Sequence, residues 1–222
     1  GGGFVNRRMH DSSRKGCLHV KLKVDDEVID LVNVHLLHDS DNLESAAHKP
    51  SRYAIERGDM LRRVTEATRL SREGFGLVCG DFNFRLDLGD VAEANPMDVQ
   101  VTSSSSVNAF IGADFWHRFR PFDRELARFN AAQADTGGVM LLECGCGFES
   151  DLSAGFPSQT RWPPTYPLTG GTKMQDPPVR SASWDCTKED VQQKGVNIPT
   201  YSPKRMPAWC DRVLGTAGAW TR

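Results

Sequence analysis

The stretch GLVCGDFNFRLD, residues 76–87, decides the fold of this chain. It opens with a short apolar run, Gly76 to Cys79, and continues into a glycine followed by acidic, aromatic and amide side chains. Such a run is typical of a buried strand that delivers a loop at its end. In extended geometry Asp81 and Asn83 point to the same side, so the stretch predicts a carboxylate and an amide over one site. An acidic residue and an asparagine at this spacing are also typical of a capped turn, and that alternative stays open.

Two β-rich runs precede this strand. From Cys17 to Val24 apolar and polar residues alternate, which is the period of a half-buried strand. Asp25 and Asp26 supply turn chemistry before a second run, Val28 to His35. The pattern predicts a β-hairpin.

Helical spacing appears between the hairpin and the central strand. Apolar residues recur among arginines and glutamates, which predicts an amphipathic helix over residues 51–72 that ends at Gly74 and Gly76. The order β-β-α-β favours a mixed sheet with helices. Further on, Ser103 to Ser106 predicts a surface turn, and Pro121 to Ala132 predicts a helix that begins at the proline. Residues 145–206 lack periodicity, which is typical of binding loops or disordered inserts.

The composition excludes several classes of protein. With 222 residues the chain is expected to form a single domain, residues 1–222. No apolar stretch approaches the roughly 20 residues of a membrane span, and the six cysteines are scattered, as expected of reduced thiols in a cytoplasmic protein. The net charge of −2 argues against a nucleic-acid partner. A small polyanion, in contrast, needs only a local group of cations.

Two further stretches combine polar side chains with apolar neighbours. VNVHL, residues 32–36, places His35 two residues after Asn33, and PAWCDRVL, residues 207–214, contains Asp211 next to Arg212. Taken singly, a histidine at a strand end is more often structural, and an Asp-Arg pair is usually a surface turn. Their occurrence together, in this order around GDFNFRLD, favours a functional site.

In this order the three stretches resemble the hallmark motifs of the inositol polyphosphate 5-phosphatases, members of the endonuclease/exonuclease/phosphatase superfamily. SRKG at 13–16 and PPTYP at 163–167 are similar to the type I branch, which acts on inositol 1,4,5-trisphosphate. The resemblance runs from Ser13 to Leu214 and is weak over 95–140 and 170–200. It implies a four-layer α/β sandwich with two mixed sheets flanked by helices, and Mg²⁺ as cofactor.

The resemblance also implies roles for individual residues. Asp81 would be the general base that activates the attacking water, and Asn83 would orient that water; both would contact the metal. His35 would hold the scissile phosphate with support from Asn33. Asp211 and Arg212 would form a pair that fixes the loop and places a phosphate. The reaction would be in-line attack by water, without a serine or cysteine nucleophile.

A second group of residues would select the substrate. The resemblance implies that Tyr166, Lys204 and Arg205 grip the 4-phosphate, and that Arg14 and Lys15 supply further cations. Pro167 follows the tyrosine where lipid-active members commonly have a lysine, which favours soluble inositol 1,4,5-trisphosphate and 1,3,4,5-tetrakisphosphate as substrates.

Three alternatives stay open. They are a 5-phosphatase acting on phosphatidylinositol 4,5-bisphosphate, a catalytically dead module that binds inositol phosphates, and a nuclease of the same superfamily. The type I branch also implies peripheral association with membranes through a C-terminal lipid.

The family pattern extends beyond both ends of this sequence. A metal-binding glutamate would lie upstream of SRKG, and a motif with a catalytic histidine would follow PAWCDRVL. We therefore expect the isolated 222-residue chain to have little activity. Robust magnesium-dependent phosphate release by that chain would overturn this expectation.

Overall fold

A β-hairpin begins the described part of the computed structural model, which covers residues 15–70, 74–109, 119–143, 165 and 205–220. Strands β1 (Gly16–Val24) and β2 (Glu27–His35) pair antiparallel along their whole length. Asp25 takes a φ of +54° in the turn between them. The predicted hairpin is confirmed.

The hairpin forms one side of a five-stranded mixed sheet with the order β1-β2-β3-β7-β6. The predicted central strand is β3 (Phe75–Asp81), which runs parallel to β2. On its other side β7 (Asp211–Thr216) pairs antiparallel with β3, and β6 (Leu141–Glu143) pairs antiparallel with β7. The sheet therefore joins GDFNFRLD to PAWCDRVL although more than a hundred residues separate them in the sequence.

Helix α2 (Arg52–Thr68) confirms the predicted amphipathic helix but ends earlier than expected. Ser51 caps its first turn by accepting a hydrogen bond from the Ala54 N–H. At the other end Arg69 adopts a φ of +52°, and its N–H bonds to the carbonyls of Glu66 and Thr65. The helix therefore stops at a left-handed arginine rather than at the glycines further on.

Replacing Arg69 with glycine is expected to raise the free energy of unfolding by about 0.5 kcal/mol. Glycine adopts positive φ without steric cost, which stabilises the folded state. This stabilisation is larger than the loss that follows from the greater conformational entropy of glycine in the unfolded chain. Urea denaturation of both proteins measures the difference. Arg63→Gly, at an exposed position inside the same helix, is the matched control and should lower the free energy of unfolding by about 1 kcal/mol.

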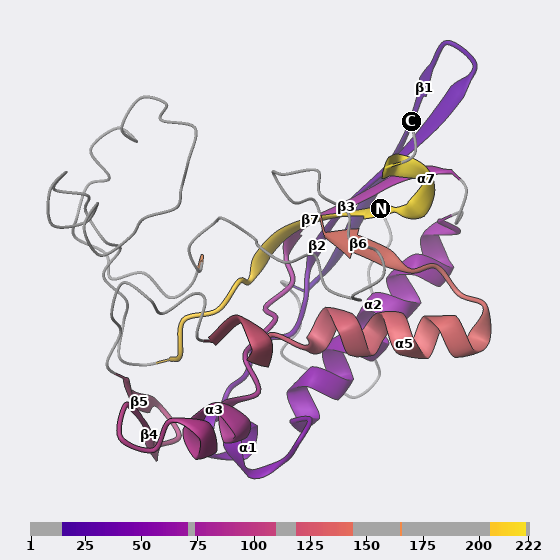
Figure 1. Cartoon of the computed structure of the whole chain (residues 1–222). Coiled ribbons are helices and arrows are strands. Elements are labelled where there is room, and N and C mark those ends of the chain that lie inside the picture. Colours follow the sequence, from indigo (N-terminus) through magenta and orange to yellow (C-terminus); the bar gives the residue numbers. More distant parts are fainter. Residues whose placement is uncertain (1–14, 71–73, 110–118, 144–164, 166–204, 221–222) are drawn as a thin grey trace, which may run out of the picture.

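One face of the sheet packs against α2 and α5 (Glu125–Thr136), which Figure 1 shows lying together on the same side of the strands. The residues of this core are fully or nearly buried and come from β2, β3, β7 and the two helices: Val32, Val34, Val78, Leu214, Leu61, Val64 and Phe129. Burial of this apolar surface is the main stabilising contribution to the fold. It holds the strand ends in a fixed place relative to the two helices.

The helix expected over residues 121–132 starts later than predicted. Pro121 lies in a short 3-10 helix, η1 (Arg120–Phe122), and α5 begins only at Glu125. Between them Asp123 has φ −86° and ψ 81°, which is not helical, and its carboxylate binds Arg212 and Arg120. A tertiary contact thus interrupts the helix that the sequence favours. The predicted start at the proline is wrong.

A smaller layer packs beside the main core. It contains α1 (Asn42–Ala47), α3 (Leu88–Ala94), and the hairpin of β4 (Val99–Ser103) and β5 (Ser106–Ala109). The serine run forms the turn of this hairpin, as predicted. Its buried residues include Trp209 and Met206, so the segment before β7 is held by this layer. A short helix, α7 (Ala217–Trp220), follows β7.

The second large sheet of the expected sandwich is not formed by the described residues, whose other strands make only the two-stranded β4-β5 pair. The sheet face opposite α2 and α5 nevertheless carries exposed apolar side chains. Leu18, Val20 and Leu22 of β1 and Val213 of β7 are 42–57% exposed there. These side chains agree with a further layer over part of this face, but the described residues form one mixed sheet with helices. In the described part of the chain, no helix is long and apolar enough to cross a membrane.

Candidate active site

Three predicted site residues form a row across the sheet. In the register of β2, β3 and β7, His35 lies opposite Asp81 and Asp81 lies opposite Asp211. Directly opposed residues project from the same face of a sheet, so the three side chains are neighbours. The His35 Nε2 atom lies 3.5 Å from an oxygen of Asp81, and both side chains are about 40% exposed, at 43% and 39%. The row is therefore open to a ligand.

Lys15, which directly precedes β1, extends this row. Its Nζ atom lies 2.5 Å from Nε2 of His35. An ammonium group can only donate, so a charged Lys15 makes the His35 Nε2 atom the acceptor in this contact. Burial lowers the pKa of Lys15 below its ordinary value, and the charge of Asp81 offsets part of that effect. A cation, an imidazole and a carboxylate thus lie within contact of one another.

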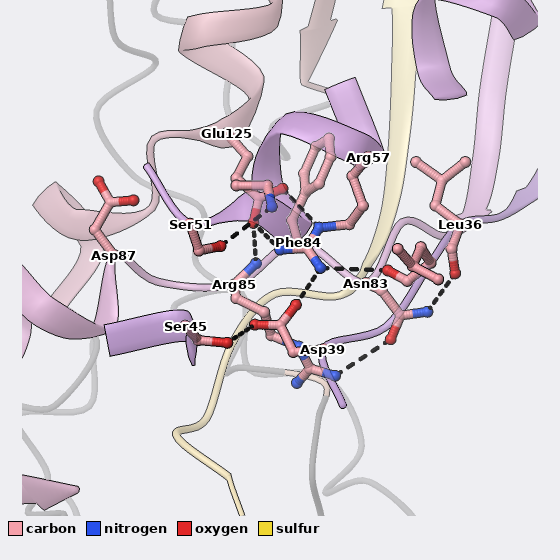
Figure 2. A network of polar contacts seen from close by, with 12 residues as sticks. Leu36, Asp39, Ser45, Ser51, Arg57, Asn83, Phe84, Arg85, Asp87 and Glu125 are labelled. Atoms are coloured by element: carbon pink, nitrogen blue, oxygen red, sulfur yellow. Dashed lines mark hydrogen bonds and ion pairs between the residues drawn. The ribbon is translucent and has the colours of Figure 1, made fainter. Parts of the chain in front are cut away.

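Asn83 differs from the expectation of an extended chain. The strand ends at Asp81, and Asn83 adopts a left-handed φ of +51°, a conformation that asparagine tolerates better than most residues. Its Nδ2 donates to the Leu36 carbonyl at 3.0 Å, and its Oδ1 accepts from Arg85 at 3.2 Å. The Asn83 N–H in turn donates to Asp81 Oδ1 at 2.9 Å. The side chain is buried and ties the segments after β2 and β3 together (Figure 2).

The donors present meet the requirements of a magnesium site only in part. Asp81 offers a half-exposed carboxylate, which suits Mg²⁺. The amide oxygen of Asn83 is buried against Arg85, so it does not face the same space. No cluster of three or more metal-ligating His, Cys, Asp or Glu residues occurs among residues 15–70, 74–109, 119–143 and 205–220. The described residues therefore do not by themselves form a complete magnesium site.

Arg212 and Asp211 do not pair with each other, contrary to prediction. Consecutive strand residues point to opposite faces, so Asp211 is exposed while the Arg212 side chain is only 2% exposed. Arg212 donates to both oxygens of Asp123 at 2.6 and 2.5 Å, to Glu143 at 3.2 Å, and to the Trp209 carbonyl at 2.8 Å. These contacts fix the segment that leads into β7.

Asp211 is held through its backbone. Its N–H and that of Cys210 both donate to the Thr165 hydroxyl, at 3.0 and 3.1 Å. Burial raises the pKa of the Cys210 thiol to about 12, so this cysteine is not a nucleophile at neutral pH.

The remaining predicted residues are only partly described. Asn33 is exposed on the same face as His35, and its Nδ2 lies 3.8 Å from the Cys79 sulfur. Arg205 donates to the side chain of Asn42 at 2.8 Å. The predictions for Arg14, Tyr166 and Lys204 lie outside the described residues.

Two residues close to the site were missed from the sequence. His38 lies among basic residues: burial lowers its pKa, and the charges of Lys15, Arg205 and Arg85 lower it further. Nothing in the sequence distinguishes this histidine from an ordinary exposed one. Arg57 is completely buried on α2. A signal for it existed, because Arg57 is four residues from both Tyr53 and Leu61 and so stands on the apolar side of the predicted helix.

Comparison with known proteins identifies the family to which this chain belongs. The chain belongs to the Endonuclease/Exonuclease/phosphatase family 2, which it matches over residues 2–133. Enzymes of this family commonly use Mg²⁺.

More specific similarity is found to inositol polyphosphate-5-phosphatase A. The human protein is 29% identical over 231 residues, which cover 93% of this chain and 48% of the human protein. The mouse protein is 30% identical over 227 residues, with the same two shares. A probable type I inositol 1,4,5-trisphosphate 5-phosphatase of Caenorhabditis elegans is 26% identical over 249 residues, covering 94% of this chain and 55% of that protein. The chain spans about half the length of the curated relatives it matches. The predicted resemblance is confirmed.

Proposed function

We propose that the protein hydrolyses the 5-phosphate of inositol 1,4,5-trisphosphate, and of inositol 1,3,4,5-tetrakisphosphate, to release inorganic phosphate. The relationship to the 5-phosphatases supports the reaction class. The observation that carries the proposal is the row of His35, Asp81 and Asp211 with Lys15 in contact with it. This row combines a proton acceptor with cationic and polar groups that suit a phosphate.

In the proposed reaction Asp81 accepts a proton from water. The water oxygen forms a bond to phosphorus while the bond between phosphorus and the oxygen at position 5 of inositol breaks. The leaving oxygen takes up a proton from solvent water and becomes a hydroxyl group. Lys15 and His35 bind the scissile phosphate, and Asn33 supports them from the same face of β2.

Asn83 and Arg212 contribute by fixing the loops in this proposal. The buried amide of Asn83 sets the chain directly after Asp81, and Arg212 sets the segment that ends at Asp211. Mg²⁺ is proposed as the cofactor on the family relationship, and the half-exposed carboxylate of Asp81 would be one of its ligands. The amide oxygen of Asn83, which the resemblance gives as a second ligand, accepts from Arg85 instead.

Substrate selection is assigned to basic residues around the row. Lys15 and Arg205 come from the described part of the chain, and Arg14, Tyr166 and Lys204 are proposed with them from the resemblance. His38 lies near the same basic residues, Lys15 and Arg205. Several cations near one proton acceptor suit a ligand that carries more than one phosphate.

The test is an assay of the full-length protein with Mg²⁺ or with EDTA. Inositol 1,4,5-trisphosphate is expected to give phosphate release at least about tenfold faster than phosphatidylinositol 4,5-bisphosphate in vesicles, because Pro167 stands where lipid-active members commonly have a lysine. A tenfold ratio of rates corresponds to about 1.4 kcal/mol in transition-state binding. EDTA is expected to abolish release. Faster release from the vesicles would assign the lipid as substrate instead.

Two other outcomes separate the remaining alternatives. Micromolar binding of inositol 1,4,5-trisphosphate in calorimetry, without any turnover, would indicate a binding module and overturn the proposed hydrolysis. Cleavage of DNA with no release of phosphate from inositol phosphates would indicate a nuclease.

A further inference from the structure

A buried charge cluster connects the two helices to the candidate active site, and the proposed chemistry does not use it. The cluster consists of Arg57 of α2, Glu125 of α5 and Asp39 of the segment after β2 (Figure 2). These side chains are 0%, 4% and 5% exposed. Moving charges out of water is costly, and such ion pairs often stabilise a fold less than apolar residues of the same volume would.

The first arm of the cluster holds the segment that follows β2. The Arg57 Nη1 group donates to the Leu37 carbonyl at 3.3 Å and pairs with the carboxylate of Asp39. The second Asp39 oxygen accepts a hydrogen bond of 2.6 Å from the Ser45 hydroxyl. The chain is thus fixed from the second residue after His35 onward.

The second arm holds the loop that follows β3. Glu125 accepts from Arg57 Nε at 2.8 Å and from Nη2 at 2.6 Å. Glu125 Oε1 also accepts the backbone N–H of Arg85 at 2.8 Å. This loop is therefore fixed four residues after Asp81. The hydrogen bond from Asn83 to the Leu36 carbonyl joins the two arms.

A guanidinium group is required for this geometry. Arg57 uses three separate nitrogens to reach two carboxylates and one carbonyl, which the single ammonium of a lysine cannot do. Burial alone would lower the pKa of Arg57, but Glu125 and Asp39 outweigh this effect and raise it above its ordinary value. Arg57 is therefore charged at neutral pH.

We propose that the buried charge cluster sets the position of the ends of β2 and β3, and thereby the approach of His35 to Asp81. Arg57, Glu125 and Asp39 are positioning residues, because their side chains act through the two loops and not on the substrate. The inference rests on the proposed function, in which those two residues take part in hydrolysis. It explains why a costly arrangement of charges stands at this place and not an apolar contact.

Arg57→Lys in the full-length protein tests the inference. We expect kcat for phosphate release to fall by about 30-fold, while KM changes by less than about threefold, because misplacement of reacting groups costs rate more than binding. The matched control is Val64→Ala, which removes buried apolar volume from the same helix without changing a polar contact to either loop. It should lower the melting temperature and leave kcat within about twofold. An equal loss of kcat in both variants would overturn the inference.

If Arg57→Lys does not fold, Glu125→Gln provides the same comparison, since its amide oxygen still accepts the Arg85 N–H but the charge pairing with Arg57 is lost. We expect the same fall in kcat with KM retained.

Amide hydrogen exchange tests the cluster independently of activity. In Arg57→Lys the amides of Leu36 and Arg85, which bond to Asp81 and Glu125, should exchange about tenfold faster than in the wild type, while that of Val78 is unchanged. Val64→Ala should show no such local increase. Unchanged exchange at Leu36 and Arg85 would refute the positioning role even in an active enzyme. An inactive wild type with the expected exchange pattern would refute only the proposed function.

Discussion

Replacing Asp81 with asparagine in the full-length protein is expected to lower phosphate release from inositol 1,4,5-trisphosphate by about 1,000-fold. An amide has the shape of the carboxylate but cannot take a proton from water at neutral pH. The fold should be retained, because the asparagine Oδ1 atom can still accept the N–H of Asn83. Release of phosphate under saturating substrate, together with thermal melting, measures both properties.

Asp59→Asn is the matched control for this variant. Asp59 is an aspartate on the exposed side of α2, with a side chain that is 56% exposed and 3.6 Å from Arg62. The substitution should change the rate by less than about twofold, because surface ion pairs contribute little. If Asp81→Asn kept more than about a tenth of the wild-type rate, Asp81 would not be the base.

Gly80→Ala is expected to lower the free energy of unfolding by about 3 to 5 kcal/mol, which corresponds to a loss of roughly 6 to 20 °C in melting temperature. Gly80 has a φ of +120°, a backbone conformation that is strained for any residue with a side chain. An added Cβ would also lie 2.3 Å from the backbone carbonyl oxygen of Val34. Since β2 and β3 pair at this point, the clash separates the strands directly beside His35 and Asp81.

Gly58→Ala makes the same chemical change with the opposite expected sign. Gly58 lies inside α2, and an added Cβ there meets no atom within 4 Å. Alanine favours a helix over glycine, so the free energy of unfolding should rise by about 0.5 to 1 kcal/mol. Equal effects of the two substitutions would contradict a close approach of β2 and β3 at Gly80.

The local elements of this protein were predictable because they depend on nearby residues. The alternation from Cys17 onward gave the hairpin, and the apolar spacing after Ser51 gave α2. Where a tertiary contact competes, prediction failed. Asp123 leaves the helical conformation because Arg212 and Arg120 bind its carboxylate, and nothing near Asp123 in the sequence signals the contact with Arg212.

The candidate site divides in the same way. The sequence alone singled out the residue types of the proposed chemistry, since His35, Asp81 and Asp211 stand in motifs that resemble those of a known family. Only the tertiary structure decided how they are arranged: the strand register places the three side chains in one row, Lys15 reaches His35, and Arg212 turns away from Asp211 into the interior. The buried charge cluster around Arg57 belongs to this second part. Its members come from α2, α5 and the segment after β2, and only the packing of the helices against the sheet brings their charges together.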